Sequence, residues 1–311
     1  MARVFVTRSL PGTALDRLAA AHDIDVWPAR LPPPRPDLSG GARDAEGLLS
    51  LLTDPIDAEL IAACRKLRAI SNYAVGVDNV DLAAATARSI PVGNTPGVLT
   101  DSTADLALAL MLAVARRIVE GDAFVRAGEW VTWAPGLLLG HDLHGATVGI
   151  VGFGRIGQAV ARRVDGFGCE ILHTSRRSGV ELGELLERSD FVTLHCPLTP
   201  ETRGLIGVDA LRRMKPSAYL VNTARGPIVD TGALRSGLEQ GEIAGAALDV
   251  TDPEPLPADH PLLGAPNLVV IPHLGSATHA TRERMADMAV DNLLAGLAGE
   301  RMPYCANPEV Y

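Results

Sequence analysis

The chain has 311 residues, of which 47% are hydrophobic and 21% charged, and its formal net charge is −9. This length allows two domains with hydrophobic cores, and the negative charge disfavours binding to nucleic acid. We expect no signal peptide, because the N-terminal residues MARVFVTRSL have no long apolar core followed by a small-residue cleavage site. We also expect no membrane span, because the longest apolar run, Leu106–Ala115, is too short to cross a bilayer. The four cysteines form no CxxC pair, so we expect no metal site, no disulfide framework and a cytoplasmic location.

The N-terminal third alternates short apolar runs with helical stretches, as parallel α/β layers do. The pattern predicts one helix, at 13–22, and four strands, at 3–7, 47–52, 67–73 and 90–94. The proline-rich segment 31–41 is expected to be a surface connection, because proline is excluded from helix interiors and central strands.

A long apolar helix is predicted over 100–117, with Ser102 and Asp105 forming a capping box at its start. Six mostly apolar strands are predicted after it, at 146–152, 170–175, 190–196, 218–224, 243–250 and 267–273. This composition is typical of a doubly wound parallel sheet that is covered on both faces.

The last predicted helix, 278–299, is long enough to return to the first domain. The expected fold is α/β, with two Rossmann-like or flavodoxin-like domains built on doubly wound parallel sheets. A dinucleotide-binding domain, 100–283, is inserted into a substrate domain made of 1–99 and 284–311.

A glycine-rich loop follows the first of the six strands and opens a helix. Its residues are Gly152, Phe153, Gly154, Arg155, Ile156 and Gly157. In this setting GxGxxG predicts a dinucleotide site, because Gly152 permits the tight turn, Gly154 allows close approach of a pyrophosphate, and Gly157 allows close packing of helix and strand. The exposed N–H groups at the start of the helix favour the anion.

The end of the next strand carries cations where an NAD site has an acidic residue. Ser175 and Arg176 stand there, followed by Arg177. Both Ser175 and Arg176 can donate hydrogen bonds to a 2′-phosphate, so the sequence predicts a preference for NADP(H), with NAD(H) possible. The alternative is that both arginines are solvated loop charges. Of the two, Arg177 is the weaker candidate for a contact with the 2′-phosphate.

Hydride transfer to a carbonyl needs a proton donor and an anchor for the substrate. His195 and His273 both end predicted strands, where the working residues of open α/β sheets lie. Arg225 follows another strand end and suits a carboxylate, and Glu254 lies in a proline-rich loop after a further strand. A carboxylate beside a histidine favours its protonated form, but these considerations leave the choice between the two histidines open.

Seven stretches together resemble the D-isomer-specific 2-hydroxyacid dehydrogenases, and most closely their glyoxylate/hydroxypyruvate reductase branch. They are NYAVGVDNVD, NTPGVLTDSTADLALALMLAVARR, GFGRIG, HCPLTPETRGLIG, VNTARG, LDVTDPEPLPADHPLL and PHLGSAT, between Gly47 and Pro303. The resemblance implies a catalytic triad of Arg225, Glu254 and His273, with His273 as the acid. It also implies that the N–H groups of Val75 and Gly76 bind the substrate carboxylate, with Arg225 and His273 as further substrate contacts.

The resemblance implies further cofactor contacts, with Asp249 holding the nicotinamide amide. The other positions are Thr103, Cys196, Pro197, Thr202, Thr223, Ala224 and Gly275. Ala224 departs from the serine that the family often has, and Pro227 is a second departure, but neither changes the triad.

The expected reaction is NAD(P)H-dependent reduction of glyoxylate or hydroxypyruvate to glycolate or D-glycerate. The alternatives are another 2-oxo acid as substrate, or a dinucleotide-sensing scaffold without activity. Formate oxidation is disfavoured, because that related branch replaces the residue at Glu254. A homodimer is expected, since Trp130 and Trp133 lie in the loop-like stretch 128–140 outside any predicted core. By resemblance, Trp133 reaches a partner's active site and restricts substrate size.

Overall fold

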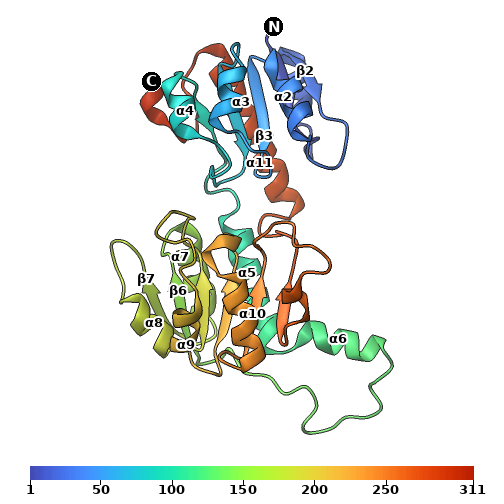
Figure 1. Ribbon diagram of the computed structural model, residues 1–311, viewed down its shortest axis with the longest axis vertical. Helices are drawn as coiled ribbons and strands as arrows, with labels where there is room; N and C mark the ends of the chain where they lie inside the picture. Colours follow the sequence, from blue (N-terminus) through green and yellow to red (C-terminus); the bar gives the residue numbers. More distant parts are fainter. The chain divides into compact units, whose positions relative to one another are not determined.

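The computed structural model describes residues 1–311, which divide into two compact units (Figure 1). Unit 1 consists of Met1–Leu99 and Ala277–Tyr311, and unit 2 is the continuous segment Thr100–Ser276. The chain returns to unit 1 at Ala277 and not at residue 284. The reason is that helix α11 (His279–Ala298) packs against the sheet of unit 1 from its first turn onward, where Thr281 and Met285 are buried.

Unit 1 is built on a parallel five-stranded sheet with the order β2-β1-β3-β4-β5. Its strands are β1 (Arg3–Val6), β2 (Asp23–Val26), β3 (Gly47–Leu51), β4 (Ala69–Tyr73) and β5 (Val92–Gly93). This is the flavodoxin-like strand order. Helices α1 (Ala14–Ala21) and α11 cover one face, and α2 (Arg35–Arg43), α3 (Ala58–Ala63) and α4 (Leu82–Ala87) cover the other.

Side chains that alternate along the strands of unit 1 contribute to the hydrophobic clusters on both faces of the sheet. Val4 and Val6 belong to the cluster under α1 and α11, whereas Phe5 between them belongs to the opposite cluster. Successive strand residues point to opposite faces, so a strand between two helical layers must be apolar at every position.

Unit 2 contains a parallel six-stranded sheet with the order β11-β10-β9-β8-β6-β7. Its strands are β6 (Thr147–Val151), β7 (Glu170–Thr174), β8 (Phe191–Leu194), β9 (Tyr219–Asn222), β10 (Gly245–Leu248) and β11 (Leu268–Val270). The order reverses between β6 and β8, and the glycine-rich loop leaves β6 at this switch point. Ligands of open α/β sheets bind at such points.

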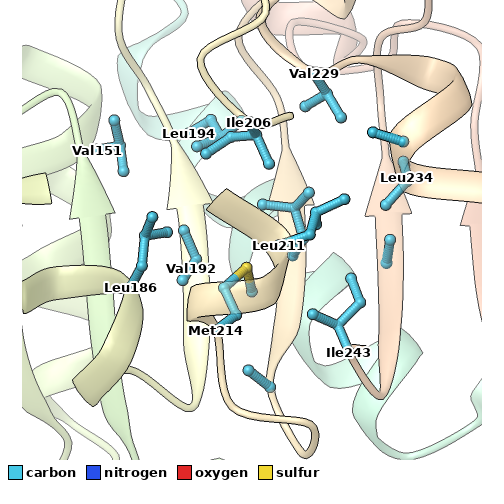
Figure 2. Packing of buried hydrophobic residues seen from close by; sticks show 14 of the residues in the cluster. Val151, Leu186, Val192, Leu194, Ile206, Leu211, Met214, Val229, Leu234 and Ile243 are labelled. Carbon is cyan, nitrogen blue, oxygen red and sulfur yellow. The ribbon is translucent and has the colours of Figure 1, made fainter. Parts of the chain in front are cut away.

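Two helical layers cover the sheet of unit 2. Helices α5 (Thr100–Ala115) and α7 (Arg155–Asp165) lie on one face, and α8 (Leu182–Arg188), α9 (Val208–Arg213) and α10 (Thr231–Gln240) lie on the other. Figure 2 shows the core under the second layer, to which Val192 and Leu194 of β8 and Leu211 of α9 belong. Helix α6 (Ile118–Arg126) and the long loop after it project from the rest of unit 2 (Figure 1).

Two expectations about local structure were wrong. The segment expected to be a connection contains helix α2, which Pro34 caps and Pro36 enters in the first turn. Proline is tolerated there because the first N–H groups of a helix have no intrahelical acceptor. Helix α5 begins at Thr100, so Ser102 and Asp105 lie inside it and form no capping box; Asp105 instead accepts a hydrogen bond of 2.6 Å from Arg163 of α7.

No helix of the structure combines the length and apolar character that crossing a membrane requires. No group of three or more histidine, cysteine or acidic side chains is arranged to hold a metal ion.

Candidate active site

The glycine-rich loop leaves an open space at the start of α7. A Cβ on Gly152, whose φ is +95°, would collide with the backbone nitrogen of Cys196, and a Cβ on Gly157 would collide with the carbonyl oxygen of Gly152. Gly154 caps α7 without a side-chain hydrogen bond, and nothing lies within 4 Å of the place where its Cβ would be. This bare helix N-terminus fits the pyrophosphate of a dinucleotide, whose charge its N–H groups favour.

The end of β7 forms a small polar turn. The Ser175 hydroxyl donates to the carbonyl of Ser178 at 3.0 Å, and the N–H of Ser178 donates back to it at 3.1 Å. The Arg176 side chain is 78% exposed and lies 3.6 Å from Glu201. Phe153 of the glycine-rich loop stacks on His173 of β7, with ring centroids 4.0 Å apart.

His195, at the end of β8, is enclosed by hydroxyl groups. Its Nε2 lies 2.9 Å from the Thr193 hydroxyl, and its Nδ1 lies 3.4 Å from the Thr223 hydroxyl. Burial lowers the pKa of His195 to about 3, and no carboxylate contacts the ring. The imidazole is therefore neutral at neutral pH and poorly suited to donate a proton.

His273, which follows β11, has a carboxylate partner. Its Nδ1 lies 2.6 Å from Oε1 of Glu254, and the two side chains are 26% and 32% exposed. Nε2 of His273 makes no hydrogen bond to the protein, so it is available to a ligand. Burial alone would raise the pKa of Glu254, but the hydrogen bond and positive charge of His273, with a contribution from Arg225, lower it overall.

Asp249 and Thr103 hold the turn that carries His273. The Asp249 carboxylate accepts the N–H groups of Leu274 at 2.5 Å and Gly275 at 2.9 Å, and its backbone carbonyl accepts the N–H of His273 at 2.8 Å. The Thr103 hydroxyl donates to the carbonyl of Gly275 at 3.1 Å. These bonds stabilise His273 in the left-handed region, at φ +53°, which few non-glycine residues adopt.

The Arg225 loop, after β9, is ordered by a residue that the sequence analysis did not select. The buried Asn222 side chain donates to the carbonyl of Arg225 at 2.9 Å and accepts the N–H of Ala224 at 3.0 Å. Gly226 lies directly against the backbone of Thr251, with which any Cβ would collide. The glycine thus brings the Arg225 loop against the loop that carries Glu254.

The remaining predicted cofactor residues lie at strand ends near the switch point. Thr202 donates to the carbonyl of Pro197 at 2.7 Å and accepts the N–H of Thr199 at 2.8 Å, which closes the turn after β8. Cys196 is partly buried, and burial raises the pKa of its thiol.

Three predicted substrate contacts lie outside this group. Val75 and Gly76 belong to the loop after β4 in unit 1. Trp133 lies in the projecting loop of unit 2 and is 77% exposed.

Comparison with known proteins identifies the family. The family model for the D-isomer specific 2-hydroxyacid dehydrogenase NAD binding domain matches residues 108–275. A glyoxylate reductase from Korarchaeum cryptofilum (strain OPF8) is 52% identical over 320 residues, covering 99% of this chain and 96% of that protein. The chain belongs to the D-isomer specific 2-hydroxyacid dehydrogenase family. A second relative of this family, the glyoxylate reductase of Thermococcus litoralis, is 49% identical over 323 residues, covering 99% of this chain and 97% of that protein.

Solved structures of the same fold include close relatives. A protein of Thermus thermophilus has a TM-score of 0.93 and 52% identity, covering 98% of this chain and 99% of that one. An NADPH-dependent glyoxylate/hydroxypyruvate reductase of Sinorhizobium meliloti, in complex with NADP and malonate, has a TM-score of 0.86 and 33% identity, covering 99% and 97%. The matches confirm the α/β, Rossmann-type class expected from the sequence, and membership of the D-2-hydroxyacid dehydrogenases makes the protein an oxidoreductase with a nicotinamide cofactor.

Proposed function

We propose that the protein reduces glyoxylate to glycolate with NAD(P)H, and that hydroxypyruvate is a second substrate, reduced to D-glycerate. The observation that carries this proposal is the 2.6 Å contact between His273 and Glu254. Arg225, Glu254 and His273 follow the neighbouring strands β9, β10 and β11, so a cation, an acid and its carboxylate partner share one edge of the sheet. The relatives named glyoxylate reductase support the choice of substrate.

In this proposal the protein's own groups bind the substrate and supply the proton. When bound, the nicotinamide supplies the hydride. Arg225 binds the substrate carboxylate through its guanidinium fork. The N–H groups of Val75 and Gly76 are further proposed substrate contacts. Nε2 of His273 donates a proton to the carbonyl oxygen, and Glu254 orients the ring through its contact with Nδ1.

We infer that NADP(H) is the preferred cofactor. Ser175 and Arg176 stand where an acidic residue would bind the ribose of NAD, and the exposed guanidinium of Arg176 is held only loosely by Glu201, which is 3.6 Å away. The other proposed cofactor contacts are the glycine-rich loop with Thr103, Cys196, Pro197, Thr202, Thr223, Ala224, Asp249 and Gly275. Asp249 already uses both carboxylate oxygens on the His273 turn, so a bond to the nicotinamide amide would share one of them.

We also infer a homodimer in which α6 and the following loop form the interface. This segment exposes several large apolar side chains: Ile118, Val119, Val125, Trp130, Val131, Trp133 and Leu139, with exposed fractions from 52% to 92%. Apolar and aromatic side chains gathered on one segment are typical of contacts between subunits. A reducing cytoplasm is the compartment that fits the four free thiols.

The test compares the two strand-end histidines in single-turnover reduction of glyoxylate. His273→Asn is expected to slow hydride transfer roughly 10²–10⁴-fold, the usual contribution of a general acid. His195→Asn, the matched control, is expected to change this step much less, because a neutral ring without a carboxylate partner does not supply the proton. A larger loss with His195→Asn would refute the assignment of the acid.

Steady-state rates with glyoxylate, hydroxypyruvate, pyruvate and a bulkier 2-oxo acid test the substrate. A kcat/KM for the bulkier acid above that for glyoxylate would assign the protein to another specificity in the same family.

A further inference from the structure

Three successive backbone carbonyl groups in the loop after β4 accept hydrogen bonds from other residues of unit 1. The carbonyl of Ala74 accepts the N–H of Thr95 at 2.8 Å. The carbonyl of Val75 accepts the side-chain amide of Asn94 at 2.8 Å, and that of Gly76 accepts the side-chain amide of Asn72 at 3.1 Å. One backbone donor and two asparagine amides therefore fix three adjacent peptide planes.

Fixing these carbonyls also fixes the N–H groups on the other side of each peptide. The only cis bonds of the chain precede Pro253 and Pro255, so the peptides of this loop are trans. In a trans peptide the N–H points opposite to the C=O. The N–H groups of Val75, Gly76 and Val77 consequently point away from the three donors, and none of them donates to an acceptor in the protein.

We propose that Asn94 and Asn72 are positioning residues for an anion-binding cradle made of the N–H groups of Val75, Gly76 and Val77. The cradle is specific for the carboxylate of a small 2-oxo acid, and this assignment rests on the proposed function. Successive backbone N–H groups that converge on one side form a typical anion-binding concavity. Val77 supplies a donor that the sequence motif alone did not indicate.

The two asparagines are themselves held in place, as positioning residues must be. The backbone carbonyl of Asn94 accepts the buried amide of Asn292 from α11 at 2.9 Å. The side-chain oxygen of Asn72, which is fully buried, accepts the Ser50 hydroxyl at 3.1 Å. A Cβ on Gly93 would come within 2.6 Å of Asn292, so the glycine permits this close approach.

The experiment measures binding of oxalate, a two-carbon dicarboxylate, to the full-length protein with NADPH bound. Asn94→Leu removes the donor to Val75 without adding charge, and Asn94→Ser is a smaller variant to be used if the first is poorly folded. Asn307→Leu is the matched control, because Asn307 is a buried amide of unit 1 that donates to the carbonyl of Ile90 and makes no hydrogen bond to residues 74–77.

The expected result for Asn94→Leu or Asn94→Ser is a dissociation constant for oxalate raised about 10-fold or more, which corresponds to about 1.4 kcal/mol. The KM for glyoxylate should rise with it, whereas NADPH affinity should not change. Asn307→Leu should leave oxalate binding unchanged even if the melting temperature falls equally.

Oxalate affinity within twofold of wild type in both Asn94 variants would overturn the inference, as would a wild-type protein that does not bind oxalate. Because binding is measured without turnover, a wild-type protein that binds oxalate but fails to reduce glyoxylate would contradict the proposed function and not the cradle.

Discussion

Replacing Glu254 with glutamine removes the negative charge beside His273 and keeps an oxygen that can accept its Nδ1–H. Two unit charges about 4 Å apart interact by about 4 kcal/mol at an effective dielectric constant of 20. The two side chains are 26% and 32% exposed, so water screens part of this energy. Because the glutamine retains a hydrogen bond, we expect a net loss of about 1–2 kcal/mol.

We expect this loss to move the basic limb of the pH–rate profile to lower pH. At about 1.36 kcal/mol per pH unit, the expected displacement is about one unit. The assay is kcat/KM for glyoxylate as a function of pH, with Glu239→Gln as control, since Glu239 lies on the surface of α10 and pairs with Arg235 at 2.8 Å. A profile that Glu254→Gln leaves unchanged would refute the coupling between the two residues.

The same pair predicts a pH dependence of stability. The pKa of Glu254 is lowered in the folded protein, so its contribution is present above the ordinary carboxyl range and is lost as the pH falls through the folded value. Wild type and Glu254→Gln should therefore differ in melting temperature at neutral pH and converge in acid. A difference that persists unchanged in acid would contradict this sign.

Three further predictions concern the cofactor, the Arg225 loop and assembly. Arg176→Ala should raise the KM for NADPH roughly 10-fold and leave the KM for NADH nearly unchanged. The reason is that an exposed charge-assisted hydrogen bond lies at the low end of about 1.5–3 kcal/mol. Equal losses for both cofactors, or an equal effect of Arg177→Ala, would contradict this prediction. Gly226→Ala should lower the free energy of unfolding by about 1–3 kcal/mol and reduce kcat/KM. Gly232→Ala should do neither, because its Cβ would meet its nearest atom at 3.4 Å. Full activity of Gly226→Ala would show that the loop can move without cost. Sedimentation at micromolar concentration should give a dimer, and Trp133→Ala should improve relative activity on bulkier 2-oxo acids; a monomer would contradict the proposed interface.

The sequence predicted most of the fold because most of its strands are apolar on both faces and because α5 and α11 are long. Helix α11 was predicted to within one residue at each end, since Thr278 and Gly299 cap it. Strand β2 was missed because its four residues alternate in burial and are defined by pairing with β1. Helix α6 was also missed: it buries none of its residues.

The candidate site was predictable where side-chain chemistry is distinctive, and less so where a residue acts on the backbone. Glycine-rich loops and strand-end histidines have recognisable spacing. Asn222, Asn72 and Asn94 hold loops through bonds to carbonyl groups, and nothing in the letters distinguishes such an asparagine from one in a turn. Helix α2 was missed for a similar reason. A proline such as Pro34 is compatible with a helix only at its start, and the sequence does not show where the helix starts.

The return of α11 to unit 1 has a consequence for biosynthesis. Helix α11 packs on β3 and β4 and completes the core of unit 1 with Leu293, Val290 and Met285. All five strands of that sheet are translated within the first 99 residues. Residues 100–298 must be made before that core can close, which takes roughly 10–40 s at ribosomal rates of about 5–20 residues per second. During this interval unit 2, a continuous segment, can fold by itself. Of the two helices on that face of the N-terminal sheet, only α1 is present meanwhile, and apolar surface exposed in this way promotes association with other chains.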